Sequence, residues 1–435
     1  MIGVGFGPSN LSLAVALEEH NGHNPNERIS GFFVERQESF GWHRSMLLPS
    51  ATMQIPFLKD VATLRNPASG YSFVSYLHAS GRLASFINNQ TFFPTRQEFH
   101  KYLEWVATQF TDQVSYGSEV IGLRLPADSG SAGTPQHLTV DVRRRGSGRV
   151  ESVRARNVVI STGLVPRMPQ GIQRDERVWH SSEFLMRFRE TDPAGIKSVA
   201  VVGAGQSAAE ITRFMYDTVP QAEVYAIVPS YGYALADDTP FANQVFDPGA
   251  VDDYYFGTDR TRQAFWDYHR NTNYSVADDE VIRDLYRRSY DEDVRGGRRL
   301  HLLNLSRVTA AERDGDRTRI NVTGGGVQEI VVDVCVFATG YHNMEVSHLL
   351  GELDRYCLRD ETGRHRVGRD YRLVTTPELG CGIYLQGGTE HSHGLTSSLL
   401  SNIAVRSGEI TESVISHRRV ERELARALPV EPAGR

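Results

Sequence analysis

The sequence predicts an α/β fold with two Rossmann-like dinucleotide-binding domains and a small, mainly helical insertion. A short apolar strand, a Gly-rich turn and a helix occur in this order at residues 1–20, and the same order recurs at residues 198–216. Length is the third observation, because a chain of 435 residues exceeds what one hydrophobic core supports. Two or three packed lobes are therefore expected.

The composition is that of a globular protein and argues against several classes of function. The net charge is −6 and the sequence pI about 6.2, without a dense block of Lys and Arg, so nucleic acid is not an expected partner. No apolar run approaches the roughly 20 residues that span a bilayer, and no cleavable signal stretch opens the chain. We therefore expect no membrane association and a cytoplasmic location. Cys335, Cys357 and Cys381 stand too far apart for a CxxC pair or clustered zinc ligands.

The first Gly-rich turn reads Gly5-Phe-Gly7-Pro-Ser-Asn10. Its first glycine permits the tight turn, and its second lets backbone amides approach a pyrophosphate at the helix N-terminus. Asn10 stands where Gly or Ala is usual. The next strand, at 29–34, ends in Glu35, which is suited to bind a ribose hydroxyl, although it lies further downstream than the usual spacing of about 20 residues. Only four residues precede the turn, so we expect the natural chain to extend further upstream.

The second turn is the fuller fingerprint. The β-branched strand Ser198–Val202 precedes Gly203-x-Gly205-x-x-Ala208, and a helix follows. After the next strand the chain reads Pro229-Ser230, where an NAD site would carry an acid for the ribose 2′-hydroxyl. The missing acid favours NADPH, but no Arg stands there either, so the sequence leaves this preference open.

The other segments are predicted as follows. Residues 45–111 mix turns and helices, and 120–150 is β-rich with a hairpin around 128–134. An apolar run at 157–163 leads to Pro166 and Pro169, a plausible lobe boundary. A polar helix at 266–290, a strand at 331–337 and a charged helix at 411–428 complete the chain.

Short motifs follow one another along nearly the whole chain. They are Gly5-Phe-Gly-Pro8, Trp42-His43, Met46-Leu-Leu-Pro49, Met53-Gln54, Phe57-Leu-Lys-Asp60, Thr63-Leu-Arg-Asn-Pro67, Phe93-Pro-Thr-Arg96, Gly203-x-Gly-Gln-Ser-Ala-Ala-Glu210, Asn271-Thr-Asn-Tyr-Ser275, Ala338-Thr-Gly-Tyr341 and Leu399-Leu-Ser401. In this order the chain resembles the microbial N-hydroxylating flavin monooxygenases. It is most similar to the L-ornithine N5-monooxygenases of hydroxamate siderophore and related nonribosomal peptide pathways, and the motifs at 63–67 and 93–96 look closer to ornithine than to lysine enzymes.

The resemblance implies FAD and NADPH as cofactors and L-ornithine and O2 as substrates, with no metal. The implied substrate-binding residues are Lys59, which would hold the carboxylate, and Asn243, Asn273 and Ser401. The expected cofactor-binding residues are Gly5, Gly7, Pro8, Glu35, Trp42, His43 and Gln54 for the flavin, and Gly203, Gly205, Gln206, Ser207 and Tyr274 for the nicotinamide cofactor. Arg96 and Asn273 are the expected catalytic residues.

The sequence departs from the family pattern at two positions. Pro56 stands where many relatives carry Ser, which could shift Lys59. Pro229 replaces an Arg that some relatives use near the 2′-phosphate, so the resemblance leaves the choice between NADPH and NADH open.

The resemblance also implies a division of the chain. Residues 1–166 and 331–435 would form the FAD-binding domain, residues 167–242 and 300–330 the NADPH-binding domain, and residues 243–299 a small helical substrate-binding region. Relatives commonly form dimers or tetramers, so a homo-oligomer is expected.

The implied chemistry begins with reduction of FAD by NADPH and capture of O2 as a C4a-hydroperoxyflavin, whose distal oxygen the substrate amine attacks. Only a neutral amine has the lone pair for this attack, yet a free alkylamine has a pKa near 10.4. The site is therefore expected to favour the neutral amine, through desolvation or through a nearby cation such as Arg96.

Several alternatives remain open from the sequence. A lysine N6-hydroxylase and a Baeyer-Villiger-type oxygenase share the two-nucleotide pattern, and a flavin sensor without turnover would not need the second site. A thioredoxin-reductase-like enzyme needs a CxxC pair that is absent. His391-Ser-His393 offers two metal ligands without a completing cluster, and His180-Ser-Ser lacks the nucleophile-elbow signature of a hydrolase.

Overall fold

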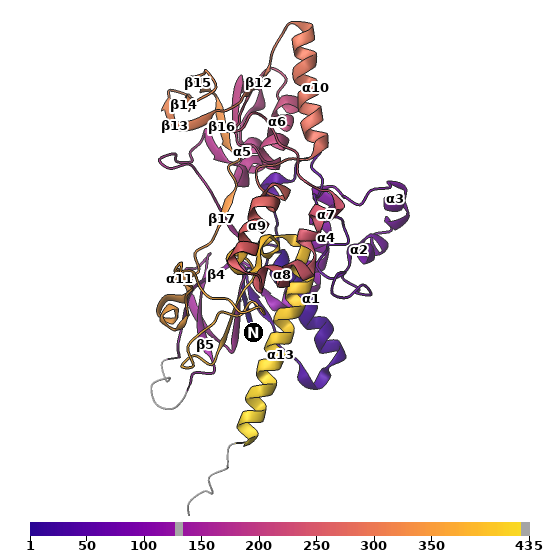
Figure 1. Cartoon of the computed structure of the whole chain (residues 1–435), viewed down its shortest axis with the longest axis vertical. Helices are drawn as coiled ribbons and strands as arrows, with labels where there is room; N and C mark the ends of the chain where they lie inside the picture. The colour runs from indigo at the N-terminus through magenta and orange to yellow at the C-terminus, as the bar shows by residue number, and fades with distance from the viewer. Residues whose placement is uncertain (127–133, 428–435) are drawn as a thin grey trace, which may run out of the picture.

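The computed structural model describes residues 1–126 and 134–427 as two lobes that are stacked along the long axis and joined at a narrower waist (Figure 1). Each lobe is built around a five-stranded parallel sheet. The predicted α/β class with two dinucleotide-type domains is confirmed.

The sheet of the first lobe has the order β18-β7-β1-β2-β3, and all its pairs are parallel. Its strands are β1 (Ile2–Val4), β2 (Phe32–Val34), β3 (Val114–Ser115), β7 (Asn157–Ile160) and β18 (Gly382–Leu385). Most of their residues are buried, as expected for a parallel sheet covered on both faces. β2 is shorter than the predicted strand at 29–34.

The sheet of the second lobe has the order β12-β11-β10-β16-β9. Its strands are β9 (Val178–His180), β10 (Ser198–Val202), β11 (Glu223–Ile227), β12 (Leu300–Leu303) and β16 (Val334–Phe337). The central strand β10 is buried along its whole length and covers the range predicted for it.

Two short strands connect the lobes. β8 (Leu164–Pro166) leaves the first lobe, β17 (Tyr341–Asn343) returns to it, and the two pair antiparallel, with Tyr341 opposite Pro166. β8 spans the predicted boundary near Pro166, and the division of the chain into domains there stays a prediction. The predicted boundary at residue 331 is wrong, because β16 pairs with β10 in the second sheet and the chain returns to the first lobe only at β17.

Each lobe also carries a three-stranded antiparallel sheet. β4 (Ser118–Arg124), β5 (Leu138–Arg144) and β6 (Val150–Ala155) belong to the first lobe, and the tip of the predicted hairpin at 128–134 lies almost wholly outside the described residues. β13 (Arg307–Asp314), β14 (Arg317–Thr323) and β15 (Glu329–Val332) belong to the second.

The helices start in different ways: Gly7 and Gly205 precede two of them, and the side chains of Ser72, Thr95 and Thr258 cap three others. Their bounds are α1 (Pro8–His23), α2 (Phe73–Ala79), α3 (Leu83–Asn88), α4 (Arg96–Ala107), α5 (Phe184–Glu190), α6 (Gln206–Thr218), α7 (Pro240–Asn243), α8 (Pro248–Tyr255), α9 (Asp259–His269), α10 (Asp279–Arg295), α11 (Ser347–Leu350), α12 (Glu390–His393) and α13 (Ile403–Ala427).

The predicted helical region at 243–299 is divided in the structure. α8 packs against α12 of the first lobe, whereas α10 packs against α6 of the second. α10 buries Val281 and Leu285 in the second-lobe core, and it provides the crossover between β11 and β12. A break at residues 273–278 separates α9 from α10, so the predicted continuous helix at 266–290 is wrong.

The terminal helix α13 starts earlier than predicted and lies against α1 (Figure 1). Leu11 and Val15 of α1 share a core with Ile403, Ile410 and Val414 of α13. Burial of side chains of this size stabilises the lobe by roughly 1.5–3 kcal/mol each. Within the described ranges, no helix is both long and apolar enough to cross a bilayer.

Candidate functional site

The turn after β1 is built for close approach of a ligand to the backbone. Gly5 has a φ of +84°, and a Cβ there would lie 2.4 Å from the Ser161 carbonyl oxygen. Gly7 is the N-cap of α1, no side chain caps the helix, and a Cβ on Gly7 would meet nothing within 4 Å. The first amides of α1 are thus open, with Pro8 at the first helical position. This arrangement fits the pyrophosphate of a dinucleotide.

Asn10 explains why this turn lacks a third small residue. Its amide donates hydrogen bonds to the carbonyl oxygens of Gly5 (2.7 Å) and Val4 (3.4 Å), and it is fully buried. The Gln386 amide donates in turn to the Asn10 side-chain oxygen, at 3.2 Å. Asn10 therefore stabilises the turn through hydrogen bonds. A glycine at this position would instead permit only close packing of the helix against the strand.

Glu35 lies directly after β2, beside the same turn. Its carboxylate accepts hydrogen bonds from the backbone N–H of Phe6 (2.7 Å) and of Gln37 (2.8 Å). A carboxylate oxygen can accept more than one hydrogen bond, so capacity remains for a ribose hydroxyl. Glu35 faces the large cavity described below, as a ribose-binding acid must.

The turn after β10 repeats this design in the second lobe. Gly203 has a φ of +143°, and a Cβ there would lie 2.4 Å from the Ala338 carbonyl oxygen. Gly205 is the N-cap of α6 without a side-chain cap, so the first amides of this helix are also open. Both turns therefore offer an uncapped helix N-terminus to a phosphate.

The two turns face one cavity of about 2900 Å³. Every site residue predicted from the sequence lines it: Gly5, Gly7, Pro8, Glu35, Trp42, His43, Gln54, Lys59, Arg96, Gly203, Gly205, Gln206, Ser207, Asn243, Asn273, Tyr274 and Ser401. These residues come from both lobes and from the waist between them, so folding brings together positions that lie hundreds of residues apart.

Arg96 connects the lobes within this cavity. Its guanidinium forms a bidentate ion pair with Glu210 of α6, with both N–O distances 2.9 Å, and also donates to the Met46 carbonyl oxygen at 2.9 Å. The Glu210 side chain is only 2% exposed. The charge of Arg96 is thus largely compensated, and its predicted influence on the substrate amine stays a prediction.

A second polar connection joins a residue predicted for the flavin to one predicted for the nicotinamide cofactor. The amides of Gln54 and Gln206 both donate to the Asp278 carboxylate, at 3.1 and 2.9 Å. The backbone N–H of Asp278 donates back to the Gln206 side-chain oxygen at 2.8 Å. Burial raises the pKa of Asp278, whereas the hydrogen bond from Gln54 lowers it.

Lys59 is half-buried in the cavity wall, 5.9 Å from the centre of the Phe246 ring. Burial lowers its pKa, and the nearby Asp247 opposes this effect. A partly desolvated ammonium group on an apolar wall is suited to bind a carboxylate that enters with the substrate.

The other predicted substrate residues lie on separate segments. Asn243 ends α7, and its amide donates to the Asp238 carbonyl oxygen at 2.6 Å. Ser401 is buried, in the turn before α13. Asn273 and Tyr274 lie in the break between α9 and α10, and the Tyr274 hydroxyl donates to Glu390 at 2.5 Å. Burial and Glu390 raise the pKa of Tyr274, so it stays a neutral donor.

Trp42 and His43 line the cavity, and His43 lies beside the connecting strand β17. Their rings are perpendicular, with centres 4.8 Å apart, and His43 lies 6.4 Å from the ring of Tyr341. His43 adopts a φ of +48°, which is uncommon for a residue with a side chain. Desolvation by the surrounding protein lowers the pKa of His43 to about 4, and Arg96 and His100 lower it further, although the residue borders the open cavity.

Glu210, Asp278 and Tyr341 lie at the site although no role was predicted for them from the sequence. Glu210 belongs to the motif at 203–210, in which the only available signal was an acid four residues after Gln206. Asp278 precedes α10 as its N-cap, a position that an acid commonly occupies without binding a ligand.

The two histidines considered as metal ligands point elsewhere. The Nε2 atom of His391 lies 2.9 Å from the backbone oxygen of His365, and that of His393 lies 3.2 Å from the backbone oxygen of Arg369. Among the described residues, Asp354, Cys357 and His365 place possible ligand atoms within 4.8 Å of one another. Asp354 is already bonded to His365 and to Arg359, whose positive charge disfavours a cation there.

Comparisons with known proteins agree with this geometry. The family model of L-lysine 6-monooxygenase/L-ornithine 5-monooxygenase matches residues 1–343. An L-ornithine N(5)-monooxygenase of Pseudomonas aeruginosa is 37% identical, over 96% of this chain and 94% of that protein. One of Burkholderia cepacia is 40% identical, over 91% of this chain and 89% of that protein.

Solved structures agree as well. The ornithine N-hydroxylase of Kutzneria sp. 744, with reduced FAD, NADP+ and L-ornithine, has a TM-score of 0.91 and 57% identity, and the match covers 96% of this chain and 99% of that one. An L-lysine 6-monooxygenase of Pseudomonas syringae has a TM-score of 0.82 and 30% identity, covering 96% and 99%. This chain belongs to the L-lysine 6-monooxygenase/L-ornithine 5-monooxygenase family.

Proposed function

We propose that the protein is an FAD- and NADPH-dependent L-ornithine N5-monooxygenase, which converts L-ornithine, O2 and NADPH to N5-hydroxyornithine, water and NADP+. The observation that carries this proposal is the single cavity onto which two uncapped helix N-termini and Lys59 all face. A sensor without turnover would not need the second nucleotide turn. The product would serve hydroxamate siderophore or related peptide synthesis.

Each lobe would hold one cofactor. We assign FAD to the first lobe, through Gly5, Gly7, Glu35 and the wall formed by Trp42 and His43, and NADPH to the second, through the Gly203–Ser207 turn. When bound, FAD supplies the activated oxygen and NADPH supplies the electrons. The protein's task is then to bind, orient and shield the reactants.

Lys59 would fix the substrate carboxylate, with Asn243, Asn273 and Ser401 binding its polar groups. Once the carboxylate is held, the number of methylene groups sets how far the amine reaches. Lysine is one methylene longer, so its amine would be misplaced when its carboxylate is held by Lys59. One methylene typically gives about 1–3 kcal/mol of discrimination between substrates, so lysine would still bind.

The substrate amine must lose its proton before it reacts. Because Glu210 compensates the charge of Arg96, we assign the lowering of the amine pKa mainly to its removal from water. Arg96 would instead position α4 against α6, next to the cofactors.

A lysine N6-hydroxylase is the second candidate, because the family model spans both activities and the lysine enzyme of Pseudomonas syringae shares the fold. The test is a hydroxylamine-product assay on purified, FAD-loaded protein, with ornithine or lysine and with NADPH or NADH. We expect product with ornithine and NADPH. Product formed only from lysine, or no consumption of NADPH that depends on the amino acid, would contradict the proposal.

We also propose a cytoplasmic homo-oligomer that binds neither nucleic acid nor membranes. Light scattering on the eluting protein measures the mass in solution, and a monomer at micromolar concentration would contradict this assignment.

A further inference from the structure

The carboxyl end of β11 is the position at which a Rossmann domain distinguishes its two nicotinamide cofactors. An acid there binds the ribose 2′-hydroxyl of NADH, and a cation accepts the 2′-phosphate of NADPH. In this chain the residues that follow β11 and Val228 are Pro229 and Ser230, and neither carries a charge. If the protein selects NADPH, the cation must come from another segment.

The neighbouring strand supplies such a segment. β12 pairs parallel with β11, so the two strands end at the same edge of the sheet. The chain then crosses back beside the end of β11, because the Ser306 N–H donates to the Val228 carbonyl oxygen at 2.9 Å and the Leu305 N–H to that of Ser230 at 2.8 Å. Arg307 follows immediately, as the first residue of β13.

Arg307 and Pro229 both line the cavity that contains the Gly203–Ser207 turn. The Arg307 side chain is exposed and makes no ion pair with any residue that the structure describes. The other arginines of this small sheet behave differently, since Arg313, Arg317 and Arg319 are each within 4 Å of an acid. Arg307 therefore lies in the cavity wall with a guanidinium that no acid of the described residues neutralises, whereas its neighbours are engaged in surface pairs.

We propose that Arg307 binds the 2′-phosphate of NADPH and replaces, from the adjacent strand, the cation that is absent at Pro229. A guanidinium matches a phosphate through two parallel hydrogen bonds, and a phosphomonoester carries nearly two negative charges at neutral pH. This assignment rests on the proposed function, because it presupposes that NADPH binds the second lobe.

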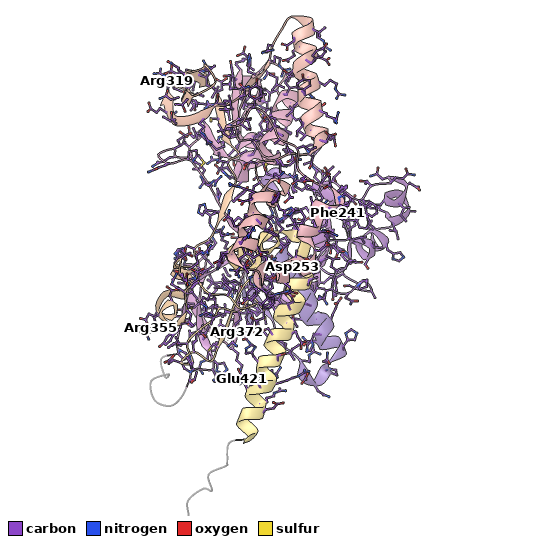
Figure 2. The ribbon with its side chains drawn as sticks, in the orientation of Figure 1. Phe241, Asp253, Arg319, Arg355, Arg372 and Glu421 are labelled. Carbon is purple, nitrogen blue, oxygen red and sulfur yellow. The ribbon has the colours of Figure 1, made fainter. Side chains whose placement is uncertain are left out.

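The test measures binding rather than turnover. Calorimetric titration of the FAD-loaded protein with NADP+ and, separately, with NAD+ gives both dissociation constants for the wild type, Arg307→Ala and Arg307→Lys. The control is Arg319→Ala, which removes the same charge from the same sheet at a position that does not line the cavity; Figure 2 shows Arg319 at the periphery of the second lobe. Flavin absorbance and thermal unfolding confirm that each variant is folded.

We expect Arg307→Ala to weaken NADP+ binding roughly 10- to 100-fold, the usual range for a charge-assisted contact, and to leave NAD+ binding nearly unchanged. Arg307→Lys should retain part of the preference, because it keeps the charge without the planar fork. Arg319→Ala should bind both nucleotides as the wild type does.

Two results would overturn the assignment and leave the proposed function intact: an unchanged preference for NADP+ in Arg307→Ala, or an equal loss of both nucleotides. A wild type that binds NADP+ and NAD+ equally would overturn it together with the NADPH specificity of the proposed function.

Discussion

Arg96 at the start of α4 and Glu210 on α6 form a bidentate ion pair in which both N–O distances are 2.9 Å. One residue belongs to the first lobe and the other to the second, 114 positions apart in the sequence. Both side chains are largely buried, with 11% and 2% of their surface exposed. The pair fixes one lobe against the other at the cavity in which the two cofactors are proposed to meet.

Glu210→Ala should therefore destabilise the protein strongly. It leaves the Arg96 charge buried without a partner, a change that typically costs about 3–5 kcal/mol. The double variant Arg96→Met with Glu210→Leu should recover much of this loss, because no unpaired charge remains. The midpoint of thermal unfolding measures both effects.

The exposed pair between Arg298 and Asp293 provides the control, since both side chains are about half exposed. Asp293→Asn should change the midpoint little, because exposed ion pairs contribute little. Equal losses in the single and double variants at 96 and 210 would contradict a buried, coupled pair.

Alanine substitutions of the two glycines in the first turn should have different effects on stability and flavin binding. A Cβ at Gly5 would lie 2.4 Å from the Ser161 carbonyl oxygen at a positive φ, so Gly5→Ala should lower stability as well as flavin content. A Cβ at Gly7 meets no protein atom within 4 Å, so Gly7→Ala should fold normally and lose only flavin affinity, because its methyl group occupies the space of the ligand. Flavin absorbance per protein and the unfolding midpoint of the flavin-free protein separate the two effects. Normal flavin content in Gly7→Ala would exclude a phosphate from this turn.

Lys59→Ala should raise the ornithine KM by roughly 10- to 100-fold, because a charge-assisted contact to the substrate carboxylate is lost. The rate of flavin reduction by NADPH, measured by stopped flow without ornithine, should change little, since Lys59 is assigned to the substrate and not to the nicotinamide cofactor. An unchanged KM would remove Lys59 from the substrate site.

The parts of the fold that were predictable are those in which local chemistry dictates residue type. The glycines at 5, 7, 203 and 205 stand at fixed spacings because a tight turn and an approaching phosphate leave no room for side chains. The strand Ser198–Val202 was identifiable because all of its residues are buried, which demands an apolar run.

The parts that were not predictable depend on pairings between distant segments. The sequence of Val334–Phe337 does not indicate that this strand pairs with β10 and not with the first sheet. A buried parallel strand has the same apolar sequence pattern in either sheet. α10 is polar and exposed along much of its length. Its few apolar residues were therefore insufficient to predict that it packs against the second lobe. Likewise, the motif that contains Glu210 does not reveal Arg96 as its partner.

The final prediction concerns how substrate binding depends on pH. Burial lowers the pKa of Lys59, and a lysine with a lowered pKa loses its charge at a lower pH than an ordinary lysine. The contact with the substrate carboxylate should therefore be complete near neutral pH and be lost on the alkaline side, before an exposed lysine would titrate. In the same range a growing fraction of the substrate amine becomes neutral, which raises the rate, so kcat/KM should rise above neutral pH and then fall.

Lys59→Arg separates the two effects, because arginine stays protonated throughout this range. Its kcat/KM should be lower than that of the wild type at neutral pH, since the geometry is altered, but its alkaline fall should be reduced or absent. Ornithine titrates identically in both measurements, so the difference between the two profiles reports residue 59 alone. Parallel alkaline limbs in the two proteins would show that the fall comes from another group, and a rate that stays flat from about pH 6 to 9.5 at saturating ornithine would contradict the requirement for a neutral amine.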